Sequence, residues 1–279
     1  MSDLPAPPTE PASLSPRASL HTLDGNAIHV TVEGHGPPLV WLHDGLVHRA
    51  GFDGQTAAFS IAFTCVRYDR PGYGDSPSPV VAYSDVAMLA SLFDRLALPA
   101  AILVGGSAGG RLALDFAILY PDRVRALVLV GAVVRGLEFS DHMLNRGWRQ
   151  PFPEIESQLP DFWANDPWLT AEANVPARAR LRQLLADYPQ NTQFKSFEPA
   201  DDLQALPRLP QIRVPTLVMV GEADIADNHA HAGILATAIP GAERQVVPHS
   251  GHLVYLEQPE DFNRRVLEFL QRRLNVPAE

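Results

Sequence analysis

The chain has 279 residues and a formal net charge of −10 at pH 7, and 46% of its residues are hydrophobic. This length and apolar fraction suffice for one large packed domain with an insertion, whereas the acidic balance argues against nucleic acid or an anionic membrane surface as a partner. Cys65 is the single cysteine, so the chain cannot form an internal disulfide. The first residues carry neither a basic start nor a continuous apolar stretch, so we expect no secretory signal and a cytoplasmic protein.

Segments of strand and helix character alternate along most of the chain. Residues 1–17 are rich in Pro, Ser and Ala and are predicted to be disordered. Two strands joined by the hairpin signal Asp24-Gly25-Asn26 follow. The predicted strands are 19–23, 27–33, 39–43, 64–68, 101–104, 125–130, 216–220 and 244–247, and the predicted helices are 52–59, 84–96, 111–120, 230–238 and 260–274. This alternation predicts the α/β class, with a mostly parallel central sheet covered by helices on both faces.

A serine stands in a Gly-x-Ser-x-Gly motif at 105–109, between a buried strand at 101–104 and an amphipathic helix at 111–120. A sharp strand-to-helix turn exposes the serine hydroxyl and needs small residues two positions before and after it, which the two glycines provide. The N–H groups of the new helix point toward the serine, so the N–H of Ala108 is available to an oxyanion. We therefore predict that Ser107 is a catalytic nucleophile. The alternative is a serine that only caps the helix.

The turn His-Asp-Gly-Leu at 43–46 resembles the His-Gly-x turn of the α/β-hydrolases. In that family the residue after His-Gly donates the second N–H of the oxyanion hole, and the resemblance implies that Gly45 does so here beside Ala108. Asp44 stands where the family usually has glycine. Aspartate tolerates a left-handed backbone, and its carboxylate is expected to point away from the oxyanion, because two negative charges repel. The histidine of the turn is expected to be structural.

The same resemblance places a triad acid after the predicted strand 216–220, in the loop that begins at residue 221. A carboxylate on the second nitrogen of the catalytic imidazole fixes its tautomer and stabilises the imidazolium. We predict that Asp224 is this acid. Glu222, which leaves the strand directly, and Asp227, one helical turn further on, are the alternatives.

His252 is the predicted base. It follows the last predicted strand, 244–247, in a Gly-His turn that resembles the family's closing motif before the final helix. A serine hydroxyl is a poor nucleophile at neutral pH and needs an adjacent imidazole to take its proton. Serine, aspartate and histidine thus occur in the chain order of the α/β-hydrolases, and the resemblance, to the branch of capped esterases and enol-lactonases, covers about residues 20–275. His249, which lacks a preceding glycine, is the rival base.

Residues 135–210 form an irregular segment whose length and position match the helical cap of α/β-hydrolases. We expect this cap over a core made of residues 18–134 and 211–279. Nine of the 22 aromatic residues fall in the segment, and a cap over a serine nucleophile needs an apolar underside that binds substrate and excludes water. The candidates for the pocket wall are Trp148, Trp163 and Trp168. The alternative is that these side chains only pack the core of the cap.

No cofactor or metal site is predicted. His229 and His231 are two apart at a helix start and face different ways, and the glycine-rich loop 69–76 is not followed by the Gly-Lys-Ser/Thr of a phosphate-binding loop. The predicted function is hydrolysis of small to medium carboxylic esters through an acyl-enzyme, with a small-molecule ester as the partner. Lactone hydrolysis, C–C bond hydrolysis and cofactor-free perhydrolysis on the same triad are alternatives. Outside the enzymes, a small-molecule receptor that has kept the pocket but not turnover is the alternative.

Overall fold

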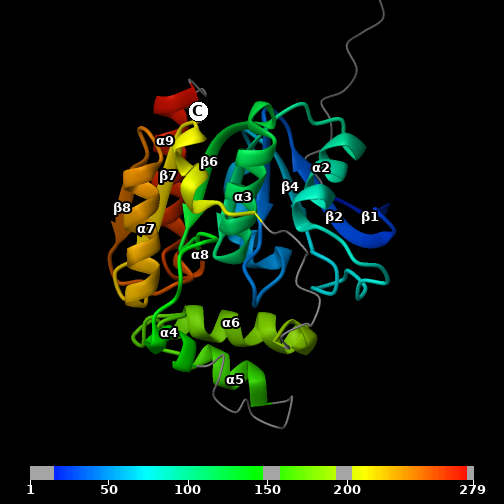
Figure 1. Cartoon of the computed structure of the whole chain (residues 1–279). Coiled ribbons are helices and arrows are strands. Elements are labelled where there is room, and N and C mark those ends of the chain that lie inside the picture. Colours follow the sequence, from blue (N-terminus) through cyan, green and yellow to red (C-terminus); the bar gives the residue numbers. More distant parts are fainter. Residues whose placement is uncertain (1–15, 147–157, 193–202, 275–279) are drawn as a thin grey trace, which may run out of the picture.

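A computed structural model of the chain describes residues 16–146, 158–192 and 203–274. Figure 1 shows a twisted central sheet with helices packed on both of its faces. The strands are β1 (Arg17–Leu23), β2 (Asn26–Gly34), β3 (Pro38–Leu42), β4 (Thr64–Tyr68), β5 (Ala101–Gly106), β6 (Val124–Val130), β7 (Thr216–Gly221) and β8 (Glu243–Val247). The α-helices are α1 (Asp53–Phe59), α2 (Asp85–Arg95), α3 (Ala108–Leu119), α4 (Asp141–Arg146), α5 (Leu159–Ala164), α6 (Val175–Asp187), α7 (Ala226–Ala238), α8 (Val254–Glu257) and α9 (Pro259–Leu274).

The strands lie in the order β1-β2-β4-β3-β5-β6-β7-β8. The pairs β1–β2 and β2–β4 are antiparallel, and every pair from β4 to β8 is parallel. Gly106 pairs with Val130 and Gly221 with Val247, which are the last residues of β5, β6, β7 and β8. The carboxyl ends of four neighbouring strands therefore lie along one edge of the sheet, the edge at which open α/β sheets place their sites.

The core consists of two apolar layers, one on each face of the sheet. Neighbouring strand residues face opposite layers: Leu103 packs with α2, α3 and α7, whereas Val104 packs with α1 and α9. Because both faces are covered, the central strands have continuous apolar sequences without alternation. Helix α9 buries Phe262, Val266 and Phe269 along one side, which is the spacing of an amphipathic helix.

The predicted strands and helices all occur, and the α/β class is confirmed. Helix α7 begins four residues earlier than predicted, at Ala226, because its first turn is polar and lacks the apolar spacing of the rest. Helix α8 has four residues, too few for a helical period in the sequence, and was not predicted. Residues 1–15 of the predicted disordered start lie outside the described residues, and Arg17 belongs to β1. None of the described helices is long and apolar enough to cross a membrane.

We call residues 131–215, which join β6 to β7, the insert. Its helices α4, α5 and α6 lie together at the lower end of the sheet in Figure 1. The insert is tied to the remainder of the chain at its start, where Ser140 donates through N (2.6 Å) and Oγ (2.8 Å) to the carboxylate of Asp227. It is tied again where the hydroxyl of Tyr188 donates to Asp75.

Candidate active site

Ser107 occupies a strained corner between β5 and α3. Its φ of 48° and ψ of −112° lie in a region that L-residues rarely adopt and that clusters at functional sites. The corner is tight: a Cβ on Gly105 would lie 2.4 Å from the carbonyl oxygen of Gly109, and one on Gly109 would lie 2.0 Å from that of Leu42. The glycines that flank the serine are therefore required for close passage of strand and helix. The N–H of Ser107 donates to Val130 O at 2.8 Å and anchors the corner on β6.

Asp224 and His252 form a direct pair. Nδ1 of His252 lies 2.9 Å from Oδ2 of Asp224, whose side chain is fully buried. Oδ1 of Asp224 accepts hydrogen bonds from Ile225 N at 2.8 Å and from Nδ2 of Asn228 at 2.7 Å. The carboxylate is thus held by two donors on one oxygen and presents the other oxygen to the imidazole, as a triad acid must.

Gly131 lies next to both the serine corner and the Asp224–His252 pair. It follows Val130, the residue that accepts from Ser107 N, and a Cβ at this position would come within 2.7 Å of Cε1 and Nδ1 of the His252 ring. The structure therefore brings Ser107, Asp224 and His252 to the same edge of the sheet, from the loops after β5, β7 and β8.

The alternative acids and the rival base are engaged elsewhere. Asp227 accepts from Ser140 at the start of the insert. Glu222 is exposed and accepts from His249 N at 3.1 Å, and His249 is itself exposed, with a left-handed φ of 56°. Asp224 is the acid whose carboxylate contacts His252.

The two oxyanion-hole candidates, Gly45 and Ala108, lie close together at the amino end of α3. A Cβ on Gly45 would lie 3.9 Å from Cβ of Ala108, so the turn after β3 rests on the first turn of the helix. Asp44 does not adopt the left-handed backbone that we allowed for it; among the described non-glycine residues a positive φ occurs at Asp24, Ala97, Ser107 and His249.

The Asp44 carboxylate accepts hydrogen bonds from its own turn and from Tyr255 of α8. Oδ1 accepts from Leu46 N at 2.6 Å and Val47 N at 2.9 Å, and Oδ2 accepts from the hydroxyl of Tyr255. Burial, together with the neighbouring carboxylate, raises the pKa of Tyr255 well above its usual value, so the phenol stays a donor. His43 is structural: its Nδ1 contacts Asp44 O at 2.8 Å, and its Nε2 accepts from Arg70 N at 3.0 Å.

Glu257 and Asn228 are two polar residues of this region that the sequence did not indicate. The buried Glu257 carboxylate accepts from Gly251 N at 2.6 Å, next to His252, and from Ala171 N of the insert at 2.6 Å. Burial raises the pKa of this carboxyl to about 7, against the opposing effect of the two backbone donors. Asn228 is 3% exposed and contacts both members of the Asp224–His252 pair.

The three candidate tryptophans have different surroundings. Trp148 lies outside the described residues. Trp163 is buried in the apolar cluster that contains Leu181 and Leu184 of α6. Trp168 is half-buried, and its carbonyl oxygen accepts from His252 N at 2.7 Å. Of the two described candidates, Trp168 is the one whose backbone contacts the candidate base.

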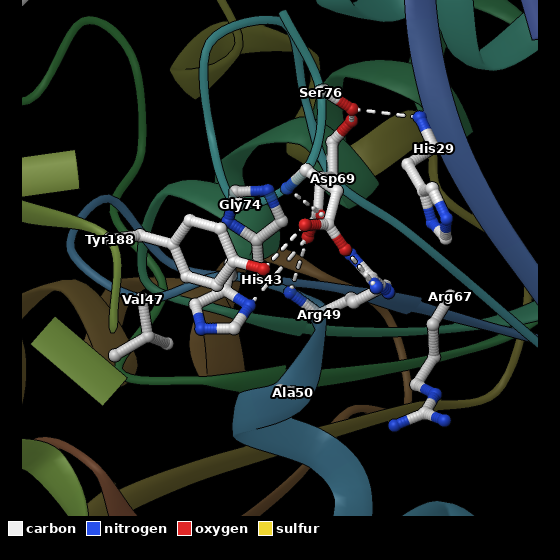
Figure 2. A network of polar contacts seen from close by, with 12 residues as sticks. His29, His43, Val47, Arg49, Ala50, Arg67, Asp69, Gly74, Ser76 and Tyr188 are labelled. Carbon is white, nitrogen blue, oxygen red and sulfur yellow. Dashed lines mark hydrogen bonds and ion pairs between the residues drawn. The ribbon is translucent and has the colours of Figure 1, made fainter. Parts of the chain in front are cut away.

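A polar network connects the turn after β4 with the segment that follows β3 and with the insert. Figure 2 shows the carboxylate of Asp69 at its centre, close to Arg49, whose backbone N donates to it at 2.8 Å. The Arg49 guanidinium also binds Asp75, which accepts from the Tyr188 hydroxyl as well. Within the described residues, His29, Asp69 and Asp75 form the one group close enough to share a metal ion. The Arg49 guanidinium forms ion pairs with both carboxylates, so these oxygens already have a cationic partner and no metal is assigned.

Comparison with known proteins agrees with the fold. The family model described as "alpha/beta hydrolase fold" matches residues 38–259. The chain belongs to the α/β-hydrolase fold family. It is 31% identical over 263 residues to a 2-hydroxy-6-oxononadienedioate/2-hydroxy-6-oxononatrienedioate hydrolase of Burkholderia vietnamiensis, covering 89% of this chain and 88% of that protein.

A carboxylesterase and an enol-lactonase are also similar to the chain. Carboxylesterase YbfK of Bacillus subtilis is 28% identical over 254 residues, covering 87% of this chain and 83% of that protein. Its crystal structure matches the chain with a TM-score of 0.74 at 25% identity, covering 92% of each. The enol-lactonase of Burkholderia xenovorans matches with a TM-score of 0.75 at 24% identity, covering 91% of this chain and all of the other, a likeness that shows the fold alone. The family, together with the relatives named as a hydrolase and a carboxylesterase, shows that this protein is an enzyme of the hydrolase class.

Proposed function

We propose that the chain is a serine-dependent carboxylesterase that acts through an acyl-enzyme on small to medium acyl esters. The observation that supports it most directly is the Asp224–His252 pair, 2.9 Å apart, at the same sheet edge as a serine held at a φ of 48°. The likeness to a carboxylesterase over 87% of the chain supports the same class of reaction.

In the proposed reaction, Oγ of Ser107 attacks the ester carbonyl carbon while Nε2 of His252 takes the hydroxyl proton. The carbonyl oxygen becomes an oxyanion between the N–H groups of Gly45 and Ala108, where the amino end of α3 adds favourable potential. The protonated imidazole, stabilised by Asp224 at Nδ1, then gives its proton to the leaving alcohol. Water repeats these steps on the acyl-serine and releases the carboxylic acid.

We also propose that residues 135–210 form a cap over a core of residues 18–134 and 211–279, with Trp168 in the pocket wall. The contact of Trp168 O with the backbone of His252 supports its nearness to the reacting atoms. The burial of Trp163 among α6 side chains favours a packing role for that residue. A closed apolar pocket limits acyl length, since each methylene contributes about 0.8 kcal/mol only while it still fits.

The experiment is turnover of p-nitrophenyl acetate with fluorophosphonate labelling. Ser107→Ala should lower turnover by about 10³ or more and abolish labelling, because only oxyanion binding and substrate binding remain. Labelling of the Ser107→Ala protein would refute the assignment of Ser107 as the nucleophile. Absence of turnover and labelling in the unaltered protein would instead favour a small-molecule receptor.

C–C bond hydrolysis is the second candidate, because the relative from Burkholderia vietnamiensis is named as a hydrolase of 2-hydroxy-6-oxononadienedioate, a compound without an ester or amide bond to hydrolyse. A vinylogous 1,5-diketone of that relative's substrate type, assayed beside p-nitrophenyl esters, separates the two. A kcat/KM for the diketone at least tenfold above that for the best ester would replace the esterase proposal. Comparable or better ester turnover supports it. Lactones belong in the same panel, because lactonases can use the same triad.

A further inference from the structure

The two oxygens of the Asp224 carboxylate have different surroundings. Oδ2 faces Nδ1 of His252 at 2.9 Å, whereas Oδ1 accepts from Ile225 N at 2.8 Å and from Nδ2 of Asn228 at 2.7 Å. Rotation of the carboxylate about its Cβ–Cγ bond would break both bonds at Oδ1. Asn228 therefore holds Oδ2 in the orientation that the imidazole needs, and its own burial, at 3% exposure, keeps water from replacing it.

The amide nitrogen of Asn228 also lies 2.9 Å from Nδ1 of His252, the same separation as that of Asp224 Oδ2. The orientation of this amide is determined by Asp224, because a carbonyl oxygen in the place of Nδ2 would face the carboxylate oxygen. In the tautomer that leaves Nε2 free to accept the serine proton, Nδ1 gives its one hydrogen to Asp224. Asn228 then lies at hydrogen-bonding distance from Nδ1, but the acceptor of the Nδ1 hydrogen is Asp224.

The two positions come from different parts of the chain. Asp224 lies in the loop after β7, and Asn228 lies in the first turn of α7, which starts at Ala226. Asparagine and aspartate are nearly identical in shape, so a carboxylate at 228 would place an acceptor oxygen where the amide nitrogen now stands. The site thus contains two places from which a side chain reaches Nδ1 of His252.

We propose that position 228 is a second place from which a carboxylate can serve as the acid of the triad, and that Asn228 acts there as a positioning residue for Asp224. The inference rests on the proposed serine mechanism and goes beyond it, because it concerns a residue that the mechanism does not require.

The test compares three variants by kcat/KM for p-nitrophenyl acetate. Asp224→Asn should lose about 10³ to 10⁴. Asp224→Asn with Asn228→Asp should recover at least tenfold over the matched control, Asp224→Asn with Asn228→Ala. Glu222 and Asp227 remain in all three, so the alternative carboxylates are constant and the variants differ only at positions 224 and 228. A folded Asn228→Asp double variant that is no more active than the control overturns the inference.

The single variant Asn228→Ala gives an independent measurement, and it tests the positioning role even if the double variant does not fold. With Asp224 present but free to turn, kcat should fall about tenfold while KM changes less than twofold. An unchanged kcat, or equal changes of kcat and KM, overturns the positioning role.

Failure of the proposed function has a different signature. If fluorophosphonate does not label Ser107 in the unaltered protein and Asp224→Asn costs no activity, both the serine mechanism and this inference fall. If fluorophosphonate labels Ser107 and Asp224→Asn loses activity as expected, but Asn228→Asp restores no activity to Asp224→Asn, only the inference about position 228 is refuted.

Discussion

Glu257 should make the stability of this protein fall as the pH rises through neutrality. Its carboxylate joins Gly251 N, beside the candidate base, to Ala171 N of the insert. Burial is the largest influence on it, and the nearby Asp224 carboxylate acts in the same direction, so the pKa of Glu257 is raised to about 7 from 4.5 in the unfolded chain.

The sign follows from proton binding. Between pH 4.5 and about 7 the unfolded chain releases the proton that the folded protein retains, so the contribution of Glu257 to stability is fully present below 4.5 and is lost as the pH rises to about 7. The full shift corresponds to about 3 kcal/mol. Between pH 5 and pH 8 the expected loss of unfolding free energy is about 2.5 kcal/mol.

Urea unfolding at pH 5 and pH 8 measures this loss when the protein is compared with Glu257→Gln, which cannot ionise. The variant loses one backbone hydrogen bond at both pH values, because its amide NH₂ must face an N–H group. The advantage of the unaltered protein over the variant should therefore shrink by about 2.5 kcal/mol from pH 5 to pH 8. Glu172→Gln, at an exposed residue of the insert, is the control and should follow the unaltered protein. Parallel pH dependence of Glu257→Gln and the unaltered protein would refute the reasoning.

Three further outcomes are expected. Gly131→Ala should lower kcat by tenfold or more with little change in KM, because the new methyl group lies 2.7 Å from the imidazole of His252 and the residue has a φ of +53°; unaltered kinetics would contradict it. Trp163→Ala should reduce the free energy of unfolding by about 3 to 5 kcal/mol and leave the acyl-length profile unchanged, whereas Trp168→Ala should move the kcat/KM maximum across p-nitrophenyl esters toward longer chains; the reverse pattern would exchange their roles. His252→Ala should cost as much activity as Ser107→Ala, and the double variant hardly more, because the two side chains act as one unit; additive losses would separate them.

The sequence predicted those parts of the molecule that depend on local pattern. Strands such as β5 and β6 are continuous apolar runs, which is how strands buried on both faces appear. The position of Ser107 followed from the glycines that a tight corner requires, and the structure contains that corner. The sequence favoured Asp224 over two neighbouring carboxylates by its place in the chain, and the three-dimensional arrangement supports that choice, because Asp224 contacts His252 whereas Asp227 binds Ser140.

The residues that the sequence missed depend on distant contacts. Glu257 binds Ala171, which is 86 positions away, and no local period or motif predicts such a pairing. Asn228 lies in the polar first turn of α7, which the apolar spacing left outside the predicted helix. Both residues are buried and polar, and burial of a polar group is a property of the fold that a single sequence does not display.

The backbone of the insert runs directly beside the candidate base. Trp168 O accepts from His252 N at 2.7 Å, Leu169 O accepts from Leu253 N at 3.0 Å, and Glu257 adds its bond to Ala171. A protein interior transmits small displacements because it is close-packed, so a shift of residues 168–171 also shifts the imidazole. A substitution in this stretch that alters acyl preference should therefore alter kcat as well. In α5 the buried Trp163 packs with α6 side chains, and changes there should act first on stability.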